Sequence, residues 1–153
     1  LWRGDSGRAG EVGHLVVDPG GAPCGCGGRG CLETVASATG ILRMASEAGL
    51  EGGVEALASR ARDGSGPEKE IFERAGEALG IAIADWLNIL DVHLVVLGGG
   101  VARSLDLLQP SIRRELARRA YALDPGLVSI ETAHLGNDAG LVGAARMALS
   151  WDP

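Results

Sequence analysis

Residues 24–33 read Cys24-Gly25-Cys26-Gly27-Gly28-Arg29-Gly30-Cys31-Leu32-Glu33, and this stretch holds all 3 cysteines of the 153-residue chain. A disulfide framework in a secreted domain normally has an even number of cysteines spread along the sequence. Here the thiols are crowded together, and the chain begins with no signal-peptide pattern. The crowding therefore favours a metal site.

Upstream of the cysteines lies a histidine, which gives the spacing His14-x9-Cys24-x-Cys26-x4-Cys31. One imidazole and three thiolates complete a tetrahedral zinc site, and the glycines between them let a loop fold tightly around an ion. Four protein ligands leave no position for a reactive water, so we predict structural zinc. The alternatives are free thiols or one disulfide, although Cys24 and Cys26 are too close for an easy unstrained bridge.

Two carboxylates flank these ligands. Glu11 precedes His14 by three positions, and Glu33 follows Cys31 by two. Either glutamate alone is typical of a helix start or of a solvated surface. A metal that draws His14 and Cys31 together would bring both carboxylates to one place, where they suit the hydroxyls of a polyol. His14 would then bind zinc through one ring nitrogen and donate from the other.

Outward from this segment, apolar runs predict strands at residues 12–17, 93–97 and 127–133, with 93–97 buried on both faces. Helical patterns cover 32–48, with a break at Gly40, and then 54–62 and 67–90. In the last of these, one buried stripe is expected at Leu79, Ile83, Trp86 and Leu90. A further helix follows the glycines at 98–100, and the next helix has Pro110 in its first turn. A last helix buries Leu141, Ala145 and Leu149. The alternation indicates an α/β fold whose sheet is small for its helices.

Composition limits the functions open to the chain. Hydrophobic residues make up 46% and charged residues 22%, with a net charge of −6. We read residues 1–153 as one domain, with no membrane-spanning run and no broad nucleic-acid surface of its own. The arginines of residues 113–119 fit a solvated helix face better than a phosphate patch. We expect a cytoplasmic protein.

The segments Gly10-Glu11-Val12-Gly13-His14 and Cys24 to Glu33 resemble the signature of the ROK family of repressors, open reading frames and sugar kinases. Residues 96–101, Val-Leu-Gly-Gly-Gly-Val, resemble the family's later glycine loop, and residues 135–140 resemble the start of its closing helix. The resemblance covers nearly the whole chain. It implies an actin-like, ribonuclease-H-like fold, of which this chain would be the C-terminal portion.

The resemblance also assigns roles to single residues. It implies that Glu11, His14 and Glu33 hydrogen-bond a sugar, and that His14, Cys24, Cys26 and Cys31 hold the structural zinc. In kinase members the loop equivalent to Gly98, Gly99 and Gly100 lies beside an adenine nucleotide. ATP and Mg²⁺ would be cofactors only if the whole protein is a kinase, and the ligand would be a monosaccharide or a sugar phosphate.

Two motifs of the family's kinases do not occur in residues 1–10, ahead of Glu11: the Asp-x-Gly-x-Thr phosphate loop and the catalytic aspartate of an Asn-Asp pair. Without them we expect the chain to be catalytically inert on its own. Because Val17-Asp18-Pro19 and residues 32–37 resemble the repressor members of the family, we interpret the chain as the sugar-sensing region of a transcriptional repressor. DNA would be contacted only through an N-terminal domain outside the chain. The alternative is the C-terminal half of an ATP-dependent sugar kinase of the glucokinase type. In either case we expect a homodimer or a higher oligomer.

Overall fold

The structure is a computed structural model that describes residues 2–121 and 124–150. Its α-helices and strands run in the following order: α1 (Glu33–Ala36), α2 (Ala38–Glu47), α3 (Val54–Asp63), α4 (Pro67–Leu90), β1 (Leu94–Leu97), α5 (Leu105–Arg119), β2 (Ser129–Thr132) and α6 (Ala139–Leu149). Short 3-10 turns lie at Val12–His14, Gly100–Ser104, Pro125–Leu127 and Gly136–Asp138. This order confirms the α/β class.

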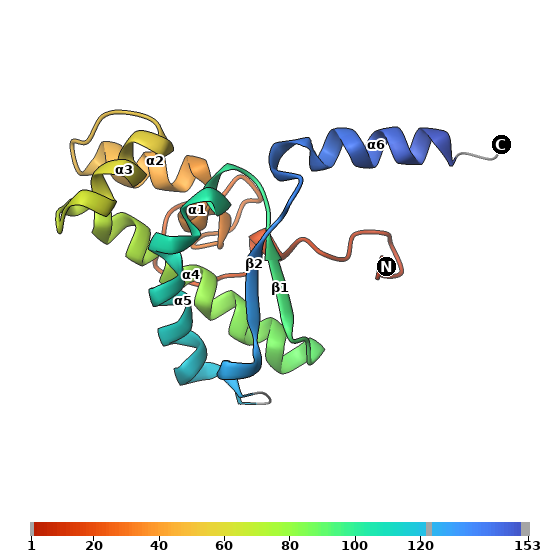
Figure 1. The fold of residues 1–153 in the computed structure, drawn as a ribbon. Helices are drawn as coiled ribbons and strands as arrows, with labels where there is room; N and C mark the ends of the chain where they lie inside the picture. Colours follow the sequence, from red (N-terminus) through yellow and green to blue (C-terminus); the bar gives the residue numbers. More distant parts are fainter. Residues whose placement is uncertain (1, 122–123, 151–153) are drawn as a thin grey trace.

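The two strands form a parallel pair in which Leu94 lies opposite Ser129 and Leu97 opposite Thr132. Parallel strands need a crossover, and α5 supplies it. Figure 1 shows α4 and α5 beside the strands, α1 to α3 at one end of this body, and α6 extending away from it. The core lies where α4 and α5 meet, among Phe72, Ile83, Leu87, Leu108, Ile112 and Leu116.

Helix α4 has the bounds that the sequence predicts. Pro67 occupies its first turn, where a missing N–H does no harm, and Glu68 and Glu70 complement the positive end of the helix dipole. Asp91 ends the helix in the left-handed conformation, with its N–H donating to the Leu87 carbonyl. The buried face runs through Phe72, Ile83 and Leu87, whereas Leu90, expected in the buried stripe, is exposed.

Glycines on α4 let α5 approach closely. A Cβ atom at Gly76 would lie 2.5 Å from the Leu108 carbonyl oxygen and 2.9 Å from Ser111 Cβ. A Cβ atom at Gly80 would lie 2.7 Å from Glu115 Cβ. Neither helix backbone can yield without moving the residues buried between them, so small residues at these positions set the distance between α4 and α5.

Replacing Gly76 with alanine is therefore expected to destabilise the protein by about 2 kcal/mol, because overpacking outweighs the gain in helix propensity. The matched control is Gly143→Ala on α6, where a Cβ atom would meet nothing within 4 Å. That variant should be neutral or slightly stabilising. Denaturant unfolding of both variants measures the difference, and equal stabilities would refute the close approach.

Near the end of α5, the buried carboxylate of Glu115 forms ion pairs with neighbouring arginines. Glu115 accepts hydrogen bonds from Arg119 Nε at 2.8 Å and from Arg118 Nη1 at 3.0 Å. Arg119, and then Arg118, hold the pKa of Glu115 below its usual range, although burial opposes them. Arg114 pairs with Glu77 of α4 at 2.7 Å. These arginines are thus engaged in ion pairs, in agreement with a structural helix face.

A carboxylate with a lowered pKa in the folded state stabilises the fold above its unfolded pKa of about 4.3, and this contribution is lost as the pH falls through the folded pKa. We therefore expect Glu115→Gln to lower the melting temperature at pH 7 and to have a progressively smaller effect as the pH falls below about 4. The exposed Glu73→Gln serves as the control. Melting curves across this pH range test the expectation, which fails if the two variants behave alike.

The structure corrects the first predicted strand and the position of the first helix break. Residues 12–17 hold a 3-10 turn at Val12–His14 and a single bridge between Val16 and Cys31, since the backbone hydrogen bonds of residues 15–17 to residues 30–32 are too few to build a strand. The break between α1 and α2 falls at Ser37, whose Oγ accepts from the Gly40 N–H. Gly40 is instead a close-packing position, where a Cβ atom would lie 2.6 Å from the Thr34 carbonyl oxygen.

Two predictions of burial and one prediction of position are also wrong. In β1 both Leu94 and Val96 are exposed, so the strand is buried on one face only. Helix α6 buries none of its described residues, and Leu141 and Leu149 face solvent. A hydrophobic pattern shows that a face is apolar, but it does not show whether another element covers that face. Pro110 lies inside α5 instead of in its first turn, since α5 already begins at Leu105.

Candidate metal centre

A clasped loop carries the three cysteines. The Gly30 N–H donates to the Ala22 carbonyl at 2.8 Å, and the Gly30 carbonyl accepts from the Val17 N–H at 2.9 Å. Inside this clasp the Cys24 N–H donates to the Gly28 carbonyl at 2.9 Å. Gly27 and Gly30 have φ angles of +90° and +67°, which glycine adopts without strain. We call residues 15–32 the zinc loop.

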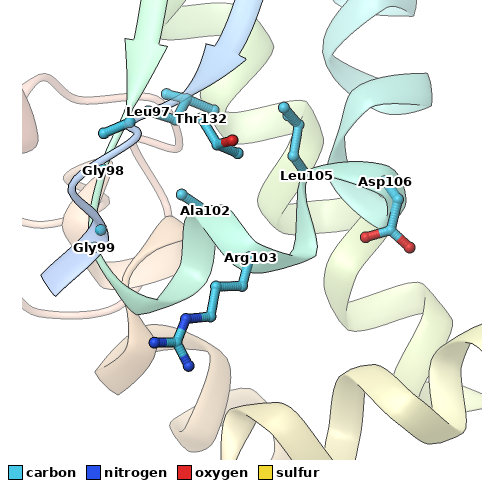
Figure 2. A pocket seen from close by; sticks show the side chains of 10 residues that line it. Leu97, Gly98, Gly99, Ala102, Arg103, Leu105, Asp106 and Thr132 are labelled. Atoms are coloured by element: carbon cyan, nitrogen blue, oxygen red, sulfur yellow. The ribbon is translucent and has the colours of Figure 1, made fainter.

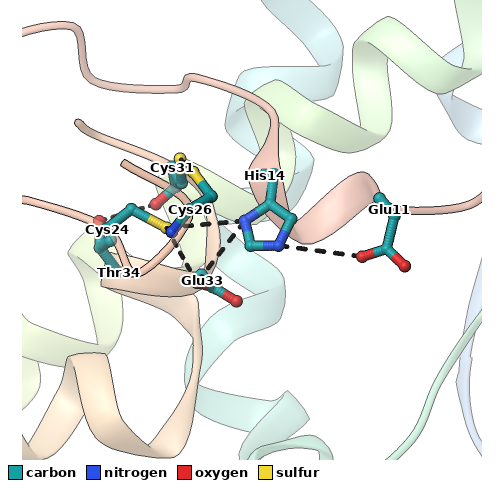
Figure 3. Close-up of polar contacts among 7 residues, drawn as sticks. All are labelled: Glu11, His14, Cys24, Cys26, Cys31, Glu33 and Thr34. Atoms are coloured by element: carbon teal, nitrogen blue, oxygen red, sulfur yellow. Dashed lines mark hydrogen bonds and ion pairs between the residues drawn. The ribbon is translucent and has the colours of Figure 1, made fainter. Parts of the chain in front are cut away.

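Three side chains of the zinc loop converge with that of His14, which immediately precedes the loop, as Figure 3 shows. The candidate ligand atoms of His14, Cys24, Cys26 and Cys31 all lie within 4.8 Å of one another. The Sγ atoms of Cys26 and Cys31 are 3.7 Å apart, and Cys24 Sγ is 3.6 Å from His14 Nδ1. All three cysteines are free thiols, so the disulfide alternative does not describe this structure.

These separations suit zinc. With Zn–S bonds of about 2.3 Å and Zn–N bonds of about 2.05 Å, a tetrahedral ion spaces two sulfurs by about 3.8 Å and a sulfur and a nitrogen by about 3.5 Å. The measured 3.7 Å and 3.6 Å lie close to these values. The cluster is therefore consistent with a zinc site.

The environment of the thiols explains why protons must leave when a metal binds. A backbone N–H from Cys26 lowers the pKa of Cys24, but the hydrogen bond to Glu33 Oε1 and burial outweigh it and raise the pKa to about 12. Burial also raises the pKa of Cys31, whereas the backbone N–H of Gly28 lowers that of Cys26. Zinc binding at neutral pH thus displaces protons from Cys24 and Cys31.

Beside the thiols, the two predicted carboxylates lie on either side of the imidazole. His14 Nε2 is 3.8 Å from Glu11 Oε2, and His14 Nδ1 is 3.6 Å from Glu33 Oε1. Nδ1 faces the sulfurs, so Nε2 is the nitrogen directed toward Glu11 (Figure 3). Glu33 also accepts a hydrogen bond from Cys24 Sγ at 2.9 Å. The predicted cluster of Glu11, His14 and Glu33 is thus assembled in one place.

The glycines at 98–100 lie away from this cluster, at the carboxyl ends of β1 and β2. A pocket of about 440 Å³ is lined there by Gly98 and Gly99, and Gly99 has a φ of +80°. Gly100 begins the following 3-10 turn and is outside the lining. Crevices at the carboxyl ends of parallel strands are common ligand sites in α/β proteins.

Two residues that line this pocket were not predicted from the sequence. They are Arg103 and Asp106, which Figure 2 shows in the lining. Arg103 pairs with Glu55 at 2.8 Å, and Asp106 accepts two hydrogen bonds from Arg62, so that α3 is linked to the pocket. The hydrogen bonds from Arg62 hold the pKa of Asp106 below its usual range. These partners lie more than forty positions apart, at separations of 48 and 44, and local spacing carries no signal for them.

Residues 1–150 match the sequence model of the ROK family. This chain belongs to the ROK family. The ROK chain is 42% identical over 161 residues to a glucokinase from Halalkalibacterium halodurans, with 94% of the chain and 48% of that protein covered. It is 35% identical over 148 residues to an N-acetylmannosamine kinase from Shigella boydii, with 97% of the chain and 50% of that protein covered.

Solved ROK structures share the fold. A ROK glucokinase from Streptomyces griseus in complex with glucose and AMPPNP superposes with a TM-score of 0.79 at 31% identity, covering 96% of this chain and 53% of that one. A ROK transcriptional regulator, a homologue of the E. coli Mlc protein, superposes with a TM-score of 0.74 at 29% identity, covering 86% and 36%. The predicted family and the partial ROK fold are confirmed.

The chain spans about half the length of the curated relatives it matches, between 48% and 50% of the two kinases above. Among the residues that the structure describes, none of the helices combines the length and apolar character needed to cross a bilayer.

Proposed function

We propose that this chain is the zinc-stabilised, sugar-binding half of a ROK sugar kinase. The observation that carries the proposal is the grouping of Glu11, His14 and Glu33, with His14 Nε2 3.8 Å from one carboxylate and Nδ1 3.6 Å from the other. Carboxylates accept and an imidazole N–H donates, which are the two needs of a sugar hydroxyl. The matched glucokinase and N-acetylmannosamine kinase make a hexose or an acylamino hexose the expected substrate.

Zinc has an indirect part in this proposal. When bound, the ion fixes the zinc loop, and it takes the place of the Cys24 proton that now donates to Glu33 Oε1 at 2.9 Å. Without that donor, Glu33 is available to a sugar hydroxyl. His14 keeps Nε2 for the sugar while Nδ1 faces the metal ligands. We therefore expect the zinc-loaded protein to bind sugar more tightly than the zinc-free protein.

For the nucleotide, we assign the pocket at Gly98 and Gly99, which lies at the carboxyl ends of both strands. ATP with Mg²⁺ would be the phosphoryl donor of the whole protein. Phosphoryl transfer also needs a base for the sugar hydroxyl and a cradle for the phosphates. The notion that residues 1–153 alone are catalytically inert stays a prediction, as does the homodimer.

A regulator is the second candidate, and the fold of the ROK regulator is the observation that favours it. In that case the same cluster would sense a monosaccharide or a sugar phosphate, and DNA would be bound by a separate domain. The relatives weigh toward the kinase, because the curated proteins compared above are sugar kinases at 35% to 42% identity. This reverses the order of preference that the sequence suggested.

The test uses the zinc-loaded protein expressed from the complete reading frame that encodes this chain. ATP-dependent phosphorylation of glucose or N-acetylmannosamine is expected, with calorimetric binding of the same sugar. Glu33→Gln should weaken sugar binding by at least about tenfold, as loss of a hydrogen bond to a charged group does. The exposed Glu70→Gln is the control. Sugar-dependent DNA binding without phosphorylation would favour the regulator, and no sugar binding would refute both.

A further inference from the structure

A second cavity adjoins the candidate sugar cluster. It has a volume of about 380 Å³ and lies between the zinc loop and α2. We call it the α2 pocket, and the polar residues of its lining are Cys24, Glu33, Thr34, Ser37, Thr39 and Arg43. Neither Glu11 nor His14 is part of that lining. The α2 pocket is therefore a compartment beside the cluster and not the cluster itself.

Glu33 joins the two compartments. Its Oε1 atom lies 3.6 Å from His14 Nδ1, within the sugar cluster, and its side chain also lines the α2 pocket. Figure 3 shows the Glu33 carboxylate between His14 and the residues Cys24 and Thr34. A ligand that hydrogen-bonds to Glu33 in the cluster thus has its next atoms at the mouth of the α2 pocket.

Existing hydrogen bonds leave the Thr34 hydroxyl of the α2 pocket as an acceptor and the Ser37 hydroxyl as a donor. Thr34 Oγ1 donates its proton to the Cys31 carbonyl at 2.7 Å, so its lone pairs remain available as acceptors. Ser37 Oγ accepts from the Gly40 N–H at 3.1 Å, so its O–H remains available as a donor. Each sugar hydroxyl both donates and accepts. The lining therefore complements hydroxyl groups better than it complements a purely apolar group.

Charge excludes an anion from this pocket. Arg43 is held by Glu47 through an ion pair on α2, and its Nη2 donates to the Thr34 carbonyl at 3.2 Å. Its positive charge is thereby balanced within the helix. The charge that remains is the carboxylate of Glu33, which repels phosphate and carboxylate groups. A neutral, hydroxylated group is the occupant that fits both the charge and the hydrogen bonds.

We propose that the α2 pocket binds a second, neutral sugar unit, joined to the sugar held by Glu11, His14 and Glu33. The preferred ligand is then a disaccharide or a longer saccharide. Cavities of roughly 300 Å³ and above are typical of sites for small organic ligands, so the volume is ample for one sugar ring. This inference rests on the proposed sugar-binding function, which supplies the first ring.

The test compares glucose with a set of glucose disaccharides joined through different positions: trehalose, kojibiose, maltose, cellobiose and gentiobiose. Calorimetry on the zinc-loaded protein from the complete reading frame measures each affinity. Thr39 is exposed at the rim of the α2 pocket, so Thr39→Leu fills the mouth without disturbing the core, and Thr39→Ser keeps the hydroxyl as the control. At least one disaccharide is expected to bind about tenfold more tightly than glucose.

Thr39→Leu should remove that gain while changing the affinity for glucose less than about twofold, and Thr39→Ser should retain it. Glucose binding without any tighter disaccharide overturns the inference and leaves the proposed function standing. A disaccharide preference that Thr39→Leu does not alter also overturns it, because the second ring then lies elsewhere. Failure of glucose and of every disaccharide to bind refutes the proposed function itself.

Discussion

Replacing Cys26 with serine is expected to lower the zinc affinity of the protein by more than a hundredfold. Loss of a residue that only orients a ligand already weakens metal binding by about 10- to 100-fold, and Cys26 is itself a candidate ligand. Since apparent binding energies of structural zinc reach about 10–16 kcal/mol in zinc-finger peptides, the zinc-loaded variant should also melt at a markedly lower temperature. Elemental analysis should find about one zinc per wild-type chain.

The exposure of Cys26 makes this variant informative. Its side chain is exposed, whereas Cys31 is buried, so serine at position 26 should leave the zinc-free protein as stable as the zinc-free wild type. The decrease in melting temperature should therefore appear only in the presence of zinc. His14→Ala should behave similarly, and the exposed His134→Ala is its control. A Cys26→Ser protein that holds one zinc as tightly as the wild type would contradict the ligand set.

The contrast between α4 and α6 shows how far the sequence could predict the fold. Both helices have apolar faces, but α4 also has Pro67 in its first turn and packs against α5, with Phe72 and Leu87 in the core cluster. The described part of α6 is helical and wholly exposed. Local signals predict that a segment is helical, whereas burial depends on which other element covers it. The residues of a segment do not specify which element covers it.

In the candidate site, too, features set by local spacing were predictable from the sequence, and features set by contacts between elements were not. His14 and the cysteines lie within residues 14–31, so spacing alone predicts that they meet. The strand expected at residues 12–17 is wrong because β-branched residues favour a strand only when a partner offers a ladder, and here the partner is the single bridge to Cys31. Ser37 and Arg43 enter the α2 pocket through helix packing, which spacing does not reveal.

Replacing Gly30 with alanine is expected to be the most disruptive change in the zinc loop. Its φ of +67° places it in the left-handed region, and a Cβ atom would lie 1.5 Å from the Asp18 carbonyl oxygen. The left-handed conformation costs an alanine about 1–2 kcal/mol, and relieving the overlap adds roughly 1–3 kcal/mol. Because the overlap is with backbone, residues 18 and 30 must separate, and the loop must open.

Opening the loop removes its clasp and displaces the ligands. The Gly30 N–H would lose the Ala22 carbonyl, and the Val17 N–H would lose the Gly30 carbonyl. Cys31 follows directly, so zinc affinity should fall together with stability. Gly25→Ala is the matched control, since a Cβ atom there meets nothing within 4 Å and the position has no positive φ. Zinc competition against a chromophoric chelator and urea unfolding measure both effects. The expectation fails if Gly30→Ala and Gly25→Ala both retain the zinc affinity and stability of the wild type. The backbone conformation at Gly30 would then not be what holds the sulfurs at tetrahedral spacing.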